Sequence, residues 1–164
     1  METTTIRLAT AADLVAINDI YNHYVANSTS TYQEQPDTLE AREHWLTHHG
    51  SKHPVTVAER DHQIVGWGSL SPFHSRSAFR KTVESSVYVH HQFLRQGIGS
   101  ALLADLITRA RHAGHHTIIA AIDSAQLPSL ALHERFGFVR VAHMQEVGFK
   151  FGKWLDVIDL QLML

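Results

Sequence analysis

The sequence predicts a single mixed α/β domain, in which one sheet carries helices on both faces. Three observations support this prediction. Some segments repeat apolar residues at helical spacing, others are short apolar or alternating runs typical of strands, and the two kinds alternate along the chain. The chain has 164 residues, of which 44% are hydrophobic, so it can bury one sizeable core. The sequence has no internal repeat, linker or low-complexity segment, and we therefore predict one domain over residues 1–164.

The first half of the chain is predicted to form a strand, two helices and a β-hairpin. Thr10 and Asp13 have the form of a helix start, a hydroxyl cap followed by an acid in the first turn. A short polar connection, Arg60 to His62, separates two strand-like runs and indicates a hairpin. The predicted elements are a strand at 5–8, helices over about 11–24 and 36–50, and strands at 55–58 and 64–68.

The second half continues the alternation of strands and helices. The run at 117–122 is continuously apolar, which is typical of a strand covered on both faces. We expect it to pair parallel to the strand at 82–90 and so to close a β-α-β unit. The predicted elements are a strand at 82–90, a helix at 97–113 ended by Gly114, a strand at 117–122, a helix at 128–136 ended by Gly137, and strands at 138–141 and 155–161.

Composition restricts the classes of function. Lys and Arg total 14 against 16 Asp and Glu, with no block of like charges, which makes nucleic acid an unexpected partner. The sequence has no apolar stretch long enough to span a bilayer and no signal-peptide pattern, so we expect a cytoplasmic protein. It has no cysteine, which excludes a thiol nucleophile. Several of its 14 histidines are adjacent pairs, which point in different directions, and we expect no metal site.

The most informative stretch of the chain is the strand Thr82 to Val89 with the glycine-rich segment that follows it. Arg95-Gln96-Gly97-Ile98-Gly99-Ser100 lies where this strand hands over to a helix. Glycines allow positive φ and a close approach of the backbone, and the N–H groups of a first helical turn point outward. These features favour a phosphate-binding turn, although glycine also ends strands for ordinary turn reasons.

Glu84 and His133 are the two candidate catalytic residues. Glu84 is either a solvent-facing strand residue or, if it is partly buried, a general base whose pKa is raised toward the working pH. His133, in the predicted helix at 128–136, is either a hydrogen-bonded packing residue or a catalytic group. The residues alone leave both alternatives open.

Taken together, these segments resemble the GNAT superfamily of acyl-CoA N-acyltransferases. The family's Q/R-x-x-G-x-G/A loop is matched at Gly97 and Gly99, but Leu94 stands where the family has Gln or Arg. The segment from Leu132 to Phe138 is similar to the family's L-Y-E-x-x-G-F, with His133 in place of the tyrosine that often acts as general acid. The resemblance implies a mixed, largely antiparallel, twisted sheet with a parallel pair of strands at an acetyl-CoA site.

The chain is similar over residues 6–161 to the phosphinothricin and methionine sulfoximine acetyltransferases in particular. The segments that carry this similarity are 20–24, 82–89, 129–134 and 148–157. It implies Glu84 as base and His133 as acid or assisting group. It implies acetyl-CoA contacts at Val87, Tyr88, Val89, Arg95, Gln96, Gly97, Ile98, Gly99, Ser100 and Gln126, the last standing where the family has asparagine. It implies substrate contacts at His74, Ser75, Arg76, Phe79, Glu84, Ser85 and Ser86, with Arg76 as the cation for a carboxylate or phosphinate.

The resemblance therefore implies an enzyme that moves acetyl from acetyl-CoA, as co-substrate, to the α-amino group of a small amino-acid-like substrate, without a metal. Two alternatives stay open: an acetyltransferase for another amine, such as a polyamine, an antibiotic or a protein N-terminus, and a non-catalytic acyl-CoA sensor. The resemblance also suggests a homodimer, to whose interface the segment from Gly148 to Asp156 contributes through its aromatic residues.

Overall fold

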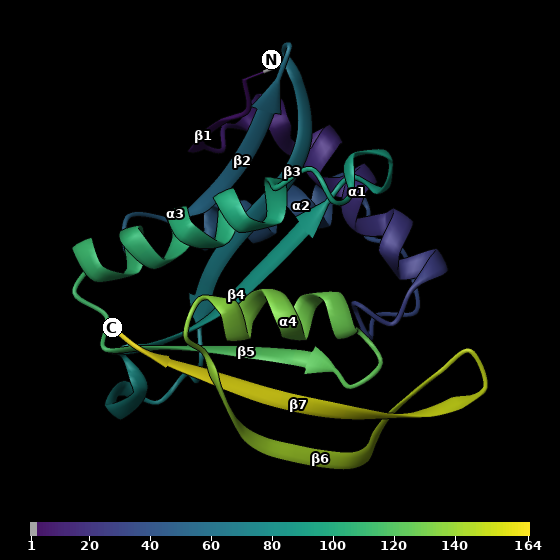
Figure 1. The fold of residues 1–164 in the computed structure, drawn as a ribbon. Helices are drawn as coiled ribbons and strands as arrows, with labels where there is room; N and C mark the ends of the chain where they lie inside the picture. The colour runs from purple at the N-terminus through teal and green to yellow at the C-terminus, as the bar shows by residue number, and fades with distance from the viewer. Residues whose placement is uncertain (1–2) are drawn as a thin grey trace.

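The computed structural model describes residues 3–164 and has one mixed sheet with helices on both faces (Figure 1). Within these residues seven strands lie in the order β1-β2-β3-β4-β5-β7-β6, and only β4 and β5 pair in parallel. This arrangement confirms the predicted fold class. The strands are β1 (Thr5–Leu8), β2 (Val55–Arg60), β3 (Gln63–Pro72), β4 (Thr82–Val89), β5 (Thr117–Asp123), β6 (Val139–Lys150) and β7 (Lys153–Met163).

The helices divide between the two faces of the sheet (Figure 1). They are α1 (Leu14–Asn27) and α2 (Leu39–Thr47) on one face, and α3 (Ile98–His112) and α4 (Leu127–Arg135) on the other. Short 3-10 turns are η1 (Ala11–Asp13), η2 (Ser77–Phe79) and η3 (His91–Phe93). The prediction of one helix over about 11–24 was wrong in its detail, because η1 precedes α1 and α1 continues to Asn27. The stops predicted at Gly114 and Gly137 are confirmed, since both adopt the left-handed conformation, with φ of 76° and 90°.

Glycines in β3 allow α3 to pack closely on the sheet. A Cβ added to Gly66 would lie 3.0 Å from the Tyr88 carbonyl oxygen and 3.1 Å from Leu102 of α3. The largest core cluster joins α3 and α4 to β4, β5 and β7, whereas α1 packs its own buried stripe on β2 and β3. The two faces of the sheet therefore have separate hydrophobic cores. Packing in these cores fixes the positions of the helices relative to the site described below.

The predicted strand at 138–141 was too short, because β6 is 12 residues long. Nearly all of β6 is exposed, and its register with β7 shifts between Arg140 and Ala142 and again between Met144 and Gly148. An exposed, interrupted strand has no regular apolar alternation from which a sequence pattern could predict it. No helix in the described part of the chain has the length and hydropathy that crossing a bilayer requires.

Candidate active site

The candidate site lies where β4 and β5 separate (Figure 1). The parallel register covers only three pairs and ends with Glu84 opposite Ile119. Beyond this point β4 stays paired with β3 as far as Val89, so its other edge faces an opening. Backbone N–H and C=O groups need hydrogen-bond partners, and an unpaired strand edge can offer them to a ligand.

A cavity of about 990 Å³ occupies this opening. Its walls come from β4, β5, the start of α3, α4 and the loop at 28–32. Both candidate catalysts, Glu84 and His133, line it. So do most of the residues predicted to bind acetyl-CoA, namely Val87, Tyr88, Val89, Arg95, Gly97, Ile98, Gly99, Ser100 and Gln126. Residues that are far apart in the sequence therefore share one cavity.

The start of α3 forms one end of the cavity. Gly97 precedes the first helical residue with φ of 80°, and Arg95 also has positive φ, 61°. The positive φ expected at both glycines is found only at Gly97, because Gly99 lies within α3 and its backbone is helical; its contact with acetyl-CoA stays a prediction. A Cβ at Gly99 would instead lie 3.4 Å from Leu132 of α4. The free N–H groups of the first turn and the macrodipole of α3 make this end suited to an anion.

A basic residue that the sequence patterns did not single out joins this end of the cavity. Arg135, in the last turn of α4, donates from Nη2 to Ser100 Oγ over 2.6 Å and lines the cavity. The sequence feature that could have identified Arg135 was its positive charge, two positions after His133. Gln96, by contrast, does not line the cavity, and its Oε1 accepts a hydrogen bond from Arg60.

Glu84 lies on the face of the sheet that α1 covers. Its cross-strand partner is Ser71, and Tyr88, four residues on in β4, pairs with Trp67, which packs against α1. The side chain is half-buried and lines the cavity. Burial, and to a smaller extent the charge of Asp159, raises the pKa of the Glu84 carboxyl above its usual value. The structure therefore agrees with the partly buried alternative for this residue.

His133 approaches the cavity from the opposite face. It is buried, with 5% of its surface exposed, and its ring packs edge-on against Phe138 at 5.0 Å between centroids. His133 Nδ1 lies 2.8 Å from the Ser129 carbonyl oxygen. Because a carbonyl oxygen only accepts, Nδ1 carries the proton and the neutral ring has a lone pair at Nε2. Burial lowers the pKa of the imidazole, and the bond to Ser129 opposes that shift.

The loop at 28–32 closes the side of the cavity next to β4, and hydrogen bonds from several elements hold it. The Tyr88 hydroxyl donates to the Ser30 carbonyl oxygen, and the Thr29 hydroxyl donates to Asp123 at the end of β5. Gln126 Nε2 donates to Thr29 Oγ1 over 3.1 Å, so this side chain is already engaged at the cavity wall. Nearby, Lys150 of β6 is almost fully buried, and its Nζ donates to the backbone carbonyls of Ser28 and Thr31.

The predicted substrate residues divide into two groups. Glu84, Ser85 and Ser86 line the cavity. The remaining four lie in the connection between β3 and β4 and are not among the residues that line it: His74, Ser75, Arg76 and Phe79. Phe79 packs against His74, with ring centroids 4.8 Å apart. A role for this connection in binding a substrate stays a prediction.

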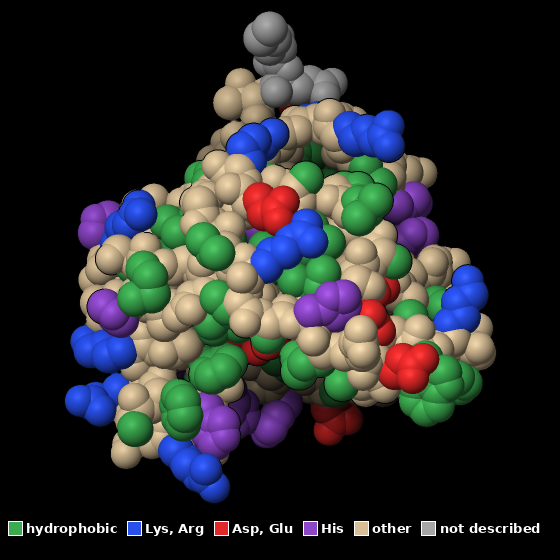
Figure 2. All heavy atoms as spheres, turned by 60° about the horizontal axis from the view of Figure 1, so that its bottom comes forward, with side chains coloured by type: hydrophobic (Ala, Val, Ile, Leu, Met, Phe, Trp, Pro, Cys, Tyr) green, Lys and Arg blue, Asp and Glu red, His purple; other side chains and the backbone are tan. Residues whose placement is uncertain are grey.

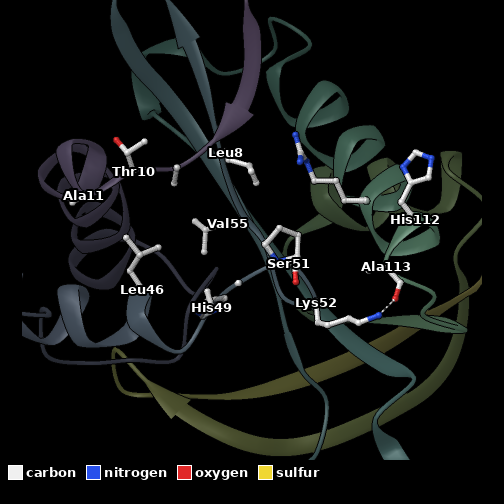
Figure 3. A pocket seen from close by; sticks show the side chains of 14 residues that line it. Leu8, Thr10, Ala11, Leu46, His49, Ser51, Lys52, Val55, His112 and Ala113 are labelled. Atoms are coloured by element: carbon white, nitrogen blue, oxygen red, sulfur yellow. Dashed lines mark hydrogen bonds between the residues drawn. The ribbon is translucent and has the colours of Figure 1, made fainter.

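A second cavity, of about 760 Å³, lies between α2, the end of α3 and the start of β2 (Figure 3). Its wall is partly apolar, with Leu8, Leu46 and Val55, and Lys52 at its edge donates to the Ala113 carbonyl oxygen over 2.6 Å. It contains none of the predicted site residues. Among residues 3–164, no three His, Asp or Glu side chains are grouped so that they could hold a metal ion.

Comparison with known proteins places these features in a family. Residues 17–138 match the Acetyltransferase (GNAT) family. The chain is 41% identical over 160 residues to the L-amino acid N-acyltransferase MnaT of Escherichia coli K12, covering 97% of this chain and 93% of that protein. It is 39% identical over 161 residues to an L-methionine sulfoximine/L-methionine sulfone acetyltransferase of Salmonella typhimurium, covering 98% and 94%.

A solved structure agrees with the same assignment. The phosphinothricin acetyltransferase of Sinorhizobium meliloti, in complex with acetyl-CoA, superposes with a TM-score of 0.94 at 38% identity. The match covers 99% of this chain and 89% of that one. The likeness therefore extends over almost the whole fold of this chain.

Proposed function

This chain belongs to the acetyltransferase (GNAT) family, and we propose that it transfers the acetyl group of acetyl-CoA to the α-amino group of a small amino-acid-like substrate. The observation that carries the proposal is the cavity that joins the turn before α3 to Glu84. Relatives that are about 40% identical and act on L-methionine sulfoximine and L-methionine sulfone support this class of acceptor.

The residues present fit acetyl-CoA. The start of α3 and Arg135 offer N–H groups and positive charge to a pyrophosphate, while the free edge of β4 offers backbone groups to the amides of the pantetheine arm. Ser85 Oγ is buried and has no hydrogen-bond partner among residues 3–164, although Ser85 lines the cavity. A buried hydroxyl without a partner is unfavourable, so a ligand that supplies one would be stabilised there. Acetyl-CoA would supply the acetyl thioester at the β4–β5 opening.

Glu84 is proposed as the general base. An α-amine is an ammonium ion near neutral pH and must lose a proton before it can attack a carbonyl carbon. The pKa of the Glu84 carboxyl is raised and so lies closer to the working pH, which suits a group that accepts a proton during the reaction. The N–H groups of the segment Val87 to Val89 would stabilise the negative charge that develops on the thioester oxygen. Both reactants are held in one cavity, so no covalent intermediate on the enzyme is required.

His133 is proposed as an assisting group. Its Nε2 lone pair and lowered pKa make the neutral ring a hydrogen-bond acceptor and a poor general acid. A poor general acid is sufficient at this position. The leaving CoA thiolate has a conjugate acid with a pKa of about 8.5, so its departure needs little protonation. We therefore assign His133 a smaller share of the rate than Glu84.

A turnover screen with acetyl-CoA tests the proposal. The acceptors are proteinogenic amino acids, methionine sulfone, methionine sulfoximine, phosphinothricin and polyamines, and release of free CoA is the readout. We expect turnover with at least one α-amino acid and N-acetylation of its α-nitrogen by mass spectrometry. Turnover of polyamines alone would replace the proposed acceptor class. Binding of acetyl-CoA without turnover of any amine would leave an acyl-CoA sensor.

We also propose that the protein is a homodimer in which the β6–β7 hairpin contributes to the interface. Phe149, Phe151 and Trp154 are each more than half exposed, and β6 is an edge strand. Figure 2, where this side of the molecule comes forward, shows hydrophobic side chains between charged ones, with a group at the right-hand end. Such exposed apolar surface is typical of an interface. Sedimentation should give a dimer mass; a monomer mass at every concentration would contradict this proposal.

A further inference from the structure

A second acid, Asp159 of β7, lies on the same face of the sheet as Glu84. In the sheet register Glu84 is opposite Ile119, Ile119 is opposite Gln161, and Ala121 is opposite Asp159. Directly opposed residues project from the same face, and so do residues two apart in one strand. Glu84 and Asp159 therefore stand on either side of β5, each about 4.8 Å from it across the sheet.

The residue between these two acids on β5 is small. Ala121 lies between them on β5, is exposed and lines the cavity, and its methyl group is too small to separate them. On this face α1 packs on β3 and β4, whereas Asp159 on β7 is partly exposed and lies outside the set of residues that line the cavity. An acceptor whose amine reaches Glu84 would therefore approach Asp159 by extending its side chain from the cavity across Ala121.

Neither carboxylate has a partner in the described part of the chain. Within residues 3–164, no hydrogen bond or ion pair involves the side chain of Glu84 or of Asp159, whereas Asp123, on the same face of β5, is bonded to Thr29. Asp159 is half-buried, and burial raises the pKa of its carboxyl. Its charge in turn contributes to the raised pKa of Glu84, which indicates that the two groups are close enough to interact. A half-buried anion without a partner is stabilised by a ligand that brings a hydrogen-bond donor or a positive charge.

We infer that Asp159 is a specificity-determining residue of the acceptor site, which selects against amino acids whose side chain ends in an anion. This inference rests on the proposed function and adds the charge class of the acceptor. A sulfone or sulfoximine side chain is uncharged, and a lysine side chain is cationic, so either can occupy the space beside Asp159. The phosphinate of phosphinothricin carries a negative charge and would be repelled there.

The experiment compares kcat/KM for three acceptors: L-methionine sulfone, phosphinothricin and L-lysine, each assayed for acetylation of the α-amine at pH 8. The wild-type protein should prefer the sulfone and lysine to phosphinothricin. Asp159→Asn keeps the shape of the side chain and removes its charge. It should raise the phosphinothricin-to-sulfone ratio of kcat/KM about tenfold and lower the lysine-to-sulfone ratio, with the KM for acetyl-CoA unchanged.

A matched control separates the effect of a charge beside the acceptor site from the effect of the net charge of the protein. Asp61→Asn makes the same change of net charge in the exposed turn between β2 and β3, where φ is 49° and asparagine is tolerated. This variant should leave both ratios within twofold of the wild type. Asp159→Thr provides a second uncharged variant suited to a strand, should the asparagine variant fold poorly.

The outcomes separate this inference from the proposed function. If the phosphinothricin-to-sulfone and lysine-to-sulfone ratios of kcat/KM are equal in the wild type, Asp159→Asn and Asp159→Thr, the role of Asp159 is overturned. The proposed amino acid acetyltransferase activity would be unaffected by that result. A wild-type preference for phosphinothricin over the sulfone would overturn the role of Asp159 as well. Failure of the wild type to acetylate any of the three α-amines would overturn the proposed function, and this inference with it.

Discussion

On the α1 face of the sheet Glu84 is half-buried and its side chain has no partner among residues 3–164, whereas on the α3 face His133 is buried and bonded through Nδ1 to its own helix. Both line the same cavity. A group without a partner can accept a proton at little structural cost, while a group held in one tautomer is oriented but already engaged. Glu84 and His133, on the two sides of the opening, therefore differ in how readily they can accept a proton, and the variants below test that difference.

The largest effect is expected at Glu84. Glu84→Gln keeps the size of the side chain but cannot accept the ammonium proton, so kcat should fall by roughly 10²–10⁴. The affinity for acetyl-CoA, measured by calorimetry, should stay nearly unchanged, because the anion-binding end lies at the start of α3. Near-normal turnover with every active acceptor would transfer the role of base to His133.

The next largest effect is expected at the turn before α3. Gly97→Val places a β-branched residue at φ of 80°, which should distort the turn and weaken acetyl-CoA binding at least tenfold, about 1.4 kcal/mol. Gly114→Val is the control, because it places the same residue at φ of 76° at the other end of α3, away from the cavity. Calorimetry should find the control within about twofold of the wild type. Similar losses in both variants would show that backbone strain weakens binding through the fold as a whole, and not through the turn before α3.

A smaller effect is expected at His133. His133→Ala should lower kcat by less than about tenfold, because thiolate departure needs little help near neutral pH. The same variant removes the contact with Phe138 and leaves a cavity, so its melting temperature should fall. A loss of kcat as large as that of Glu84→Gln would remove the distinction between the two sides.

The smallest effect is a shift in the pH profile of kcat/KM. Glu84 acts as base only when ionised, so activity should rise with pH through its pKa, which burial and then Asp159 raise. Removing the Asp159 charge lowers that pKa, so Asp159→Asn should move the acidic limb to lower pH. Glu84→Gln should lose this limb altogether. An acidic limb at the same pH in all three proteins would assign it to the substrate amine.

Local patterns predicted the central β-α-β unit well because its signals are short-range. The apolar run of β5, the helical stripe of α3 and the stops at Gly114 and Gly137 are each readable within a few residues. The length of β6 was not readable in this way. Its exposure and its two register shifts depend on its pairing with β7, which lies beyond the turn that follows it.

The features of the candidate site divide in the same way, into those that local sequence patterns predicted and those that depend on the tertiary structure. The sequence by itself determined the candidates, Glu84, His133 and the glycine turn, because residue type alone shows which side chains can exchange a proton and which positions tolerate positive φ. Only the tertiary structure decided that β4 and β5 part after Glu84, that Gly99 lies within α3 next to Leu132, and that Asp159 stands across β5 from Glu84. These features depend on strand register and on contacts between distant segments, which no local spacing encodes.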